Sequence, residues 1–325
     1  MIELDPRRGY DLIGDVHGCA HTLEHLLERL GYRFSGGVWR HPRRQALFLG
    51  DLVDRGPRIR EALHRVHDMV ADGQAVCIMG NHEFNLLGWA TPAAPGSGRQ
   101  YVREHTPRHQ RLIQETLDQF EGHSRDWQDF MGWFRSLPLF IDAGRFRMVH
   151  ACWDEQVIRT LREQFPNGCI DDAFLMASAE PGSFAQKACD RLLRGTDMRL
   201  PNGLTLTGKD GFTRAFFRTK FWEEDQAPET YGDIVFQPDA LPETVANEPL
   251  SEEQKSSLLA YGADEPLLFV GHYWRRGTPA PIRPNLACLD YSAVKFGKLV
   301  AYRLDEETRL QRDKFVWVDV KRPEN

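Results

Sequence analysis

The chain has 325 residues, of which 41% are hydrophobic and 27% are charged, and its formal net charge is -6. This length can bury a substantial core, and because no repeat or low-complexity tract interrupts it, we predict a single elaborated domain over residues 1–325. The negative charge argues against a protein that binds nucleic-acid duplexes, since phosphate backbones need a basic face.

The chain also lacks the marks of a membrane or secreted protein. No apolar segment is long enough to span a bilayer. The six cysteines are scattered without a C-x-x-C pair, and the first residues do not resemble a signal sequence. We therefore expect reduced cysteines and a cytoplasmic protein. Nothing in the sequence indicates an oligomeric state.

Three apolar runs of strand type each end in a glycine that a metal-ligand residue follows directly. They are Y-D-L-I-G-D-V-H-G (10–18), A-L-F-L-G-D-L-V-D-R-G (46–56) and A-V-C-I-M-G-N-H-E (75–83). Short unbroken apolar runs are typical of strands buried on both faces of a parallel sheet, and glycine lets the chain turn tightly at the rim. Two later runs, 146–150 and 267–272, end in histidine.

Because ligands in such sheets bind beyond the carboxyl ends of the strands, we expect the side chains at these ends to meet. They offer oxygen and nitrogen ligands and no thiolate, which suits Mn²⁺, Fe²⁺, Zn²⁺ or Co²⁺ in a catalytic site. The candidate ligands are Asp15, His17, Asp51, Asn81, His150 and His272.

Helical periodicity and turn residues define the connections between these strands. We predict crossover helices over 19–31 and 59–73, a hairpin around 35–37, a short helix from Glu83, and charged helices over 99–120 and 125–135.

The later part of the chain predicts a second sheet. Residues 137–142 and 146–150 read as paired strands that start it, and we expect it to continue at 267–271, 286–289, 298–304 and 314–320. The result would be an α/β sandwich with helices outside. Residues 153–264, between two candidate ligands, look like an inserted cap that selects the substrate.

The motifs G-D-V-H-G, G-D-L-V-D-R-G and G-N-H-E, in this order and at these intervals, resemble the phosphoprotein-phosphatase branch of the calcineurin-like metallophosphoesterases. The resemblance implies a sandwich of two mixed β-sheets flanked by helices. It implies two divalent ions at the strand ends, with Mn²⁺ as the first expectation and Fe, Zn, Co or Ni as alternatives. Asp51 would bridge them, with Asp15 and His17 on one ion and Asn81, His150 and His272 on the other.

The same resemblance assigns roles around the metals. A hydroxide bridging the ions would attack phosphorus directly, and His82 would protonate the leaving oxygen with Asp54 orienting its ring. Arg55 would bind phosphoryl oxygens with its planar fork. For the family's second arginine the candidates are Arg214 and Arg218, one turn apart if 213–222 is helical, and Arg194.

Details of the motifs bear on the substrate. Cys19 after Gly18 and the tail 286–299 resemble the bacterial diadenosine-tetraphosphatase-like branch, although Cys152-Trp153 and Tyr291-Ser292 depart from its pattern. We expect hydrolysis of a phosphate ester or anhydride, with symmetrical cleavage of dinucleoside tetraphosphates as first choice. The alternatives are a serine/threonine phosphoprotein phosphatase and a non-catalytic binding protein on the same fold. The partner is thus a phosphorylated small molecule or a phosphoprotein.

Overall fold

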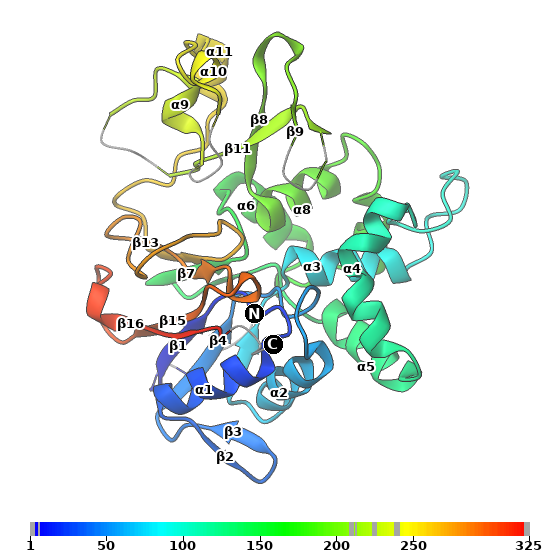
Figure 1. Cartoon of the computed structure of the whole chain (residues 1–325), viewed down its shortest axis with the longest axis vertical. Coiled ribbons are helices and arrows are strands. Elements are labelled where there is room, and N and C mark those ends of the chain that lie inside the picture. Colours follow the sequence, from blue (N-terminus) through cyan, green and yellow to red (C-terminus); the bar gives the residue numbers. More distant parts are fainter. Residues whose placement is uncertain are drawn as a thin grey trace.

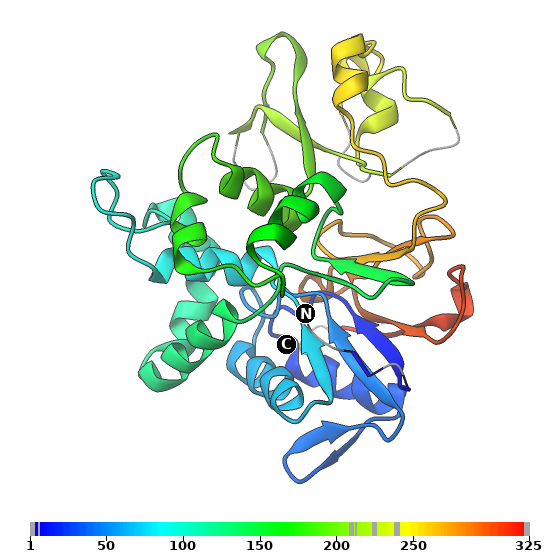
Figure 2. The same cartoon turned by 180° about the vertical axis from the view of Figure 1, so that it is seen from behind.

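The structure is a computed structural model that describes residues 4–5, 7–207, 211, 213–222, 226–236 and 241–321. It confirms the predicted α/β sandwich, with two mixed sheets at its centre and helices outside them (Figures 1 and 2). In the described residues, none of the helices combines the length and apolar character that a membrane crossing requires.

The first sheet contains the strands that carry the early motifs. Its order is β14-β15-β1-β4-β5, and β16 also pairs with β15. β1, β4 and β5 are parallel, whereas β15 runs antiparallel to β1 with Leu304 opposite Tyr10. The bounds are Gly9–Ile13 for β1, Arg44–Phe48 for β4, Ala75–Cys77 for β5, Asp290–Tyr291 for β14, Lys298–Leu304 for β15 and Phe315–Asp319 for β16.

The second sheet has the order β13-β12-β7-β6. β12 is parallel to both β7 and β13, and β6 pairs antiparallel with β7 as predicted. The bounds are Phe140–Asp142 for β6, Phe146–Val149 for β7, Leu267–Val270 for β12 and Leu286–Cys288 for β13.

The placement of the last two strands was wrong. We predicted 298–304 and 314–320 in the second sheet, but β15 and β16 belong to the first. Residue type indicates that a run is a strand, while its partner depends on tertiary contacts. Here both sides of β15 are buried, and its alternate residues face two different apolar clusters, which fits a strand inside a covered sheet.

Alternation along the strands builds the core between the sheets. In β4 Leu47 faces this core while Phe48 faces the helices, and in β12 Phe269 and Val270 divide in the same way. Aromatic contacts connect the sheets, since the ring centroid of Phe269 lies 5.2 Å from that of Tyr302. The strands are therefore held in fixed register where they approach the site.

Helices cover the first sheet and connect its strands. The predicted crossover helices and hairpin are present, and α1 and α2 lie on the outer side of the sheet (Figure 1). The bounds are Ala20–Leu30 for α1, Arg33–Ser35 for β2, Val38–Arg40 for β3, Ile59–Ala71 for α2, Asn81–Ala90 for α3, Pro107–Phe120 for α4 and Ser124–Arg135 for α5.

The prediction of a helix from residue 99 was wrong, because α4 begins at Pro107. Thr106 caps it by accepting a hydrogen bond from the His109 backbone N–H, and proline is favoured in the first turn. The residues before it form an irregular segment that contacts α3, where the Arg103 backbone N–H donates to the Gly88 carbonyl. This segment brings Arg103 to the side of α3.

The range 153–264 holds helices, small strand pairs and a core of its own. The structure pairs β11 antiparallel with β8, so Arg214 and Arg218 lie on strands and are not one helical turn apart. A separate apolar cluster includes Leu200, Phe217 and Tyr231. The bounds are Glu155–Gln164 for α6, Asp172–Ala177 for α7, Phe184–Arg194 for α8, Thr196–Arg199 for β8, Leu206–Thr207 for β9, Thr213–Arg214 for β10, Phe216–Thr219 for β11, Tyr231–Ile234 for α9, Glu243–Ala246 for α10 and Glu252–Ser257 for α11. Short 3-10 turns occur at Pro201–Gly203 (η1), Ala293–Lys295 (η2) and Arg312–Lys314 (η3).

Candidate metal centre

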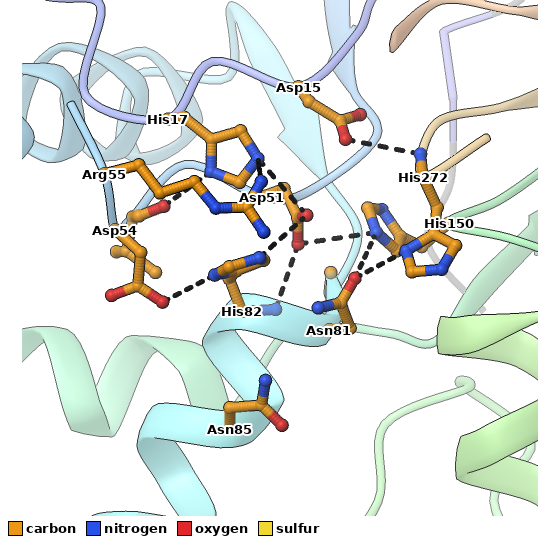
Figure 3. Close-up of polar contacts among 12 residues, drawn as sticks. Asp15, His17, Asp51, Asp54, Arg55, Asn81, His82, Asn85, His150 and His272 are labelled. Carbon is orange, nitrogen blue, oxygen red and sulfur yellow. Dashed lines mark hydrogen bonds and ion pairs between the residues drawn. The ribbon is translucent and has the colours of Figure 1, made fainter. Parts of the chain in front are cut away.

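The structure brings all six candidate metal ligands together at the ends of the central strands (Figure 3). Asp15 and His17 follow β1, Asp51 follows β4, and Asn81 begins α3, which follows β5 after residues 78–80. The two remaining candidates come from the second sheet, where His150 follows β7 and His272 follows β12.

The turns that present these side chains are strained. His17, Asp51, Asp54, Arg55 and His272 all have positive φ, between 43° and 68°. Such conformations cost about 1 to 3 kcal/mol per non-glycine residue and gather at functional sites. Gly80 permits a close approach to Asp51, because a Cβ there would lie 2.3 Å from Asp51 Oδ1.

Asp51 lies at the centre of the cluster. Its Oδ1 is 3.4 Å from His150 Nε2, and its Oδ2 is 3.6 Å from His17 Nε2. Two groups with the spacing of metal ligands result, His17 with Asp51 and His82, and Asp15 with Asp51 and His150, each with its ligand atoms within 4.8 Å of one another. Asp51 is the member that both groups share.

Hydrogen bonds at the far side of two rings fix their tautomers. His17 Nδ1–H donates to the Val53 carbonyl at 2.8 Å, and His150 Nδ1–H donates to the Leu49 carbonyl at 2.7 Å. Because a carbonyl only accepts, each Nδ1 carries a proton, so in the neutral form of either ring the Nε2 lone pair faces Asp51. This is the orientation that a metal-ligating imidazole needs.

The facing atoms are nearly all acceptors. Asn81 Oδ1 lies 3.0 Å from His150 Nε2 and 2.7 Å from His272 Nδ1. Asp15 is buried, and its Oδ1 has no hydrogen-bond partner among the described residues, while its Oδ2 accepts from the His272 backbone N–H at 3.2 Å. Acceptors that crowd together in a buried space need a cation, so the donor set fits divalent metal ions.

The charged groups of the cluster shift one another's pKa values. Burial lowers the pKa of His150, but the Asp51 carboxylate outweighs burial and raises this pKa to about 10. Burial also raises the pKa of Asp51, but the His150 and His82 imidazoles outweigh it and hold this pKa well below the usual range. Burial lowers the pKa values of His17 and His272 far below normal, so both rings are neutral.

His82 and Asp54 form a buried pair beside the cluster. Asp54 Oδ2 lies 2.5 Å from His82 Nδ1, and His82 Nε2 faces Asp51 Oδ2 at 3.8 Å. Thr116 on α4 holds the carboxylate, because its hydroxyl donates to Asp54 Oδ1 and accepts from the Asp54 backbone N–H. No sequence motif points to Thr116, since this contact joins residues 62 positions apart.

Glu83, the last residue of G-N-H-E, binds the backbone of the turns that carry Asp51 and Asn81. Its buried carboxylate accepts from the backbone N–H groups of Asp51 and Leu52 at 2.8 Å and of Gly80 at 3.0 Å. Its role does not follow from the sequence, although it belongs to the motif. Asp290 is the other buried acid that sequence reasoning missed, and with burial it raises the pKa of Asp15 well above normal.

The predicted phosphate-binding arginines have different surroundings. Arg55 is exposed, and its Nη1 lies 3.2 Å from His17 Nε2 at the edge of the cluster (Figure 3). Arg218 Nη1 donates to the carbonyl of His272 at 3.3 Å. Arg194 donates to Asn85 Oδ1 at 2.8 Å, and Asn85 lies one turn after His82 on α3. Arg214 is exposed in the hairpin of β9 and β10.

Residues 10–177 match the family described as calcineurin-like phosphoesterase. The chain therefore belongs to this family of metallophosphoesterases. The family and the donor set together imply divalent metal ions at the cluster.

Curated relatives are similar to a little under half of the chain. The asymmetrical bis(5'-nucleosyl)-tetraphosphatase PrpE of Oceanobacillus iheyensis is 45% identical over 156 residues, which cover 46% of this chain and 58% of that protein. The enzyme of the same name from Anoxybacillus flavithermus is 32% identical over 150 residues, or 44% and 56%. The matched region thus spans little more than half the length of these relatives.

Among solved structures, a protein serine/threonine phosphatase from Saccharomyces cerevisiae has a TM-score of 0.49. It is 13% identical, and the likeness covers 98% of this chain and 82% of that one. This likeness is too distant to bear on activity.

Proposed function

We propose that this protein is a divalent-metal-dependent phosphoesterase that hydrolyses a phosphate ester or anhydride. The observation that carries the proposal is the position of Asp51, which belongs to both groups with the spacing of metal ligands; one of these groups contains His82, and Asp54 lies beside that ring. Bound divalent ions supply two effects, a lower pKa of bound water and neutralisation of charge on phosphoryl oxygens.

The side chains of the cluster have separate roles in this proposal. Two ions, with Mn²⁺ as first choice, would be held by Asp15, His17, Asp51, Asn81, His150 and His272. Hydroxide derived from water adds to phosphorus, the bond from phosphorus to the leaving oxygen breaks, and His82 Nε2 gives this oxygen its proton. The proton that the water released restores the protonated His82 ring. Asp54, at 2.5 Å, fixes the His82 ring and stabilises its positive charge. Arg55 binds phosphoryl oxygens with its fork.

For the substrate we propose a dinucleoside tetraphosphate. Support comes from the PrpE relatives, whose names give bis(5'-nucleosyl)-tetraphosphates as substrates and asymmetrical cleavage as the pattern. That pattern differs from the symmetrical cleavage that the motifs led us to expect. A serine/threonine phosphoprotein phosphatase is the second candidate.

We infer further that residues 153–264 form a cap that selects the substrate. We also infer a cytoplasmic location, because the six cysteines are free.

Product analysis tests the proposal. The Mn²⁺-loaded protein is incubated with diadenosine tetraphosphate and, separately, with a phosphothreonine peptide at equal concentration. ATP with AMP as first products would show asymmetrical cleavage, and ADP alone would show symmetrical cleavage. Fast dephosphorylation of the peptide with the dinucleotide left intact would overturn the substrate. If neither these substrates nor p-nitrophenyl phosphate were hydrolysed with any divalent ion, the chain would be a binding protein.

A further inference from the structure

Two arginines from distant parts of the chain meet at one amide beside the candidate site. Arg103 Nη1 donates to Asn85 Oδ1 at 3.0 Å, and Arg194 Nη2 donates to the same oxygen at 2.8 Å. Asn85 is buried on α3, and the Arg194 guanidinium carbon lies 5.6 Å from the centroid of the Phe84 ring. Both positive groups are thus held in defined positions.

This arrangement differs from an ordinary ion pair, because the shared acceptor is uncharged. Arg194 is paired with Asp190 at 2.6 Å, but Arg103 forms no ion pair within the part of the chain that the structure describes. Arg103 Nε is buried and has no hydrogen-bond partner there. Burial, and then the charge of Arg194, lower the pKa of Arg103 to about 10. The pair therefore carries excess positive charge that an anion would relieve.

Arg103 and Arg194 lie on the side of the site that contains His82. Asn85 follows His82 by one helical turn, so the two side chains are neighbours on α3 (Figure 3). The charge of Arg103 also acts on Asp54, the partner of His82. Arg55 and Arg218, in contrast, contact His17 and His272 among the candidate ligands. Arg103 and Arg194 are thus on the side of the proton donor, where the leaving group departs.

We propose that Arg103, Arg194 and Asn85 form a subsite for the phosphate groups of the leaving group. This inference rests on the proposed phosphoesterase function and narrows it to substrates whose leaving group is itself a phosphate chain, as in a nucleoside polyphosphate. Guanidinium groups match phosphate oxygens in pairs, and the Asn85 amide supplies further donors. An alcohol leaving group, such as a serine or threonine side chain, gains nothing from two such cations.

Kinetics with two leaving groups test the subsite. The Arg103→Gln/Arg194→Gln double variant and the wild type are assayed with diadenosine tetraphosphate and with p-nitrophenyl phosphate, whose leaving group has no phosphate. Each lost charged hydrogen bond costs about tenfold in affinity. We expect kcat/KM for the dinucleotide to fall roughly 100-fold, with the loss on the aryl ester at least about tenfold smaller. Arg125→Gln is the matched control, because Arg125 is 94% exposed and pairs with Asp129 on α5.

The possible outcomes distinguish a failure of the proposed subsite from a failure of the proposed phosphoesterase function. Equal losses on both substrates would overturn the subsite and leave the phosphoesterase function standing. If the wild type hydrolysed neither substrate, the proposed function itself would fail. Arg194→Gln alone serves if the double variant does not fold, because this side chain is 34% exposed and its loss leaves Arg103 in place. As a second readout, inorganic tripolyphosphate should inhibit hydrolysis of the aryl ester about tenfold more weakly in that variant.

Discussion

Asp51 is the residue whose replacement should be most damaging, because both groups of candidate ligands contain it. Asp51→Asn keeps the size of the side chain but removes the charge that faces His17 and His150. We expect bound metal, measured by elemental analysis after gel filtration, to fall well below the wild-type content. Activity should fall by more than the roughly 10- to 100-fold that changes outside the ligands cost. Asp129 is an exposed aspartate on α5, so Asp129→Asn should change neither metal content nor activity. Full metal content in Asp51→Asn would refute the role of Asp51 as a metal ligand.

His82 should behave differently, since its proposed role is to give a proton and not to hold metal. In His82→Ala we expect metal content to stay near the wild-type value and kcat to fall by about 10²- to 10⁴-fold. The loss should be larger for phenyl phosphate than for p-nitrophenyl phosphate, because the poorer leaving group depends more on protonation. Equal losses on the two esters would rule out His82 as the general acid.

At the scale of elements, α3 and the turn after β4 are joined by one carboxylate. Glu83 accepts backbone hydrogen bonds from Asp51, Leu52 and Gly80, so Glu83→Gln would set amide donors against these N–H groups. We expect the free energy of unfolding, from urea denaturation with EDTA present, to fall by about 2 to 4 kcal/mol. Glu115→Gln on the exposed side of α4 should cost less than about 0.5 kcal/mol. A similar small loss in both variants would contradict the role of Glu83.

The end of β12 approaches Asp15 so closely that only glycine fits. A Cβ on Gly271 would lie 2.1 Å from Asp15 Oδ1, the carboxylate oxygen that lacks a partner. Gly271→Ala should displace this oxygen, and we expect weaker metal binding in a titration followed by calorimetry. Gly132 in α5 is the matched control, because nothing lies within 4 Å of a Cβ there. Metal affinity that is unchanged in Gly271→Ala would show that Asp15 is not a ligand.

Local signals predicted the elements well, and long-range contacts explain what they missed. The G-D and G-N junctions placed Asp15, Asp51 and Asn81 at strand ends, because a short apolar run followed by glycine has few other structural solutions. The irregular segment before Pro107 was missed, since it is held by contacts between distant residues, such as the Arg103 backbone N–H bond to the Gly88 carbonyl of α3. Thr116 and Arg103 were missed for the same reason, because their partners lie far away in the sequence.

At the scale of the whole molecule, the last strands complete the sheet that the first strand begins. β15 lies beside β1, and this pairing places Asp290, at the start of β14, near Asp15. Composition and periodicity do not encode which sheet a late strand joins, so this part of the fold could not be read from the sequence. The site is consequently built from both ends of the chain, and it forms only when the two sheets have closed on their common core.

The closure of the first sheet supplies a pH-dependent contribution to stability. Asp305, directly after β15, pairs with Arg44 of β4 and with Lys314 of η3, each at 2.5 Å. Burial raises the pKa of Asp305, but hydrogen bonds from Lys314 and Arg44 outweigh it and lower the pKa to about 2. Because the folded-state pKa is below the unfolded one, the contribution is complete above the unfolded value of about 3.9 and is lost as the pH falls toward 2.

Asp305→Asn tests this contribution by urea denaturation at several pH values. The side chain is 46% exposed, so solvent screening limits the expected loss at pH 7 to about 1 kcal/mol. The difference from the wild type should persist at pH 5 and shrink as the pH falls from 4 to 3, because the wild-type carboxylate begins to take up its proton there. Asp319→Asn, whose partner Lys298 it meets at an exposed position, should cost less than about 0.5 kcal/mol. A loss in Asp305→Asn that stayed constant down to pH 3 would mean that packing, and not the ionised carboxylate, holds β15 to β4.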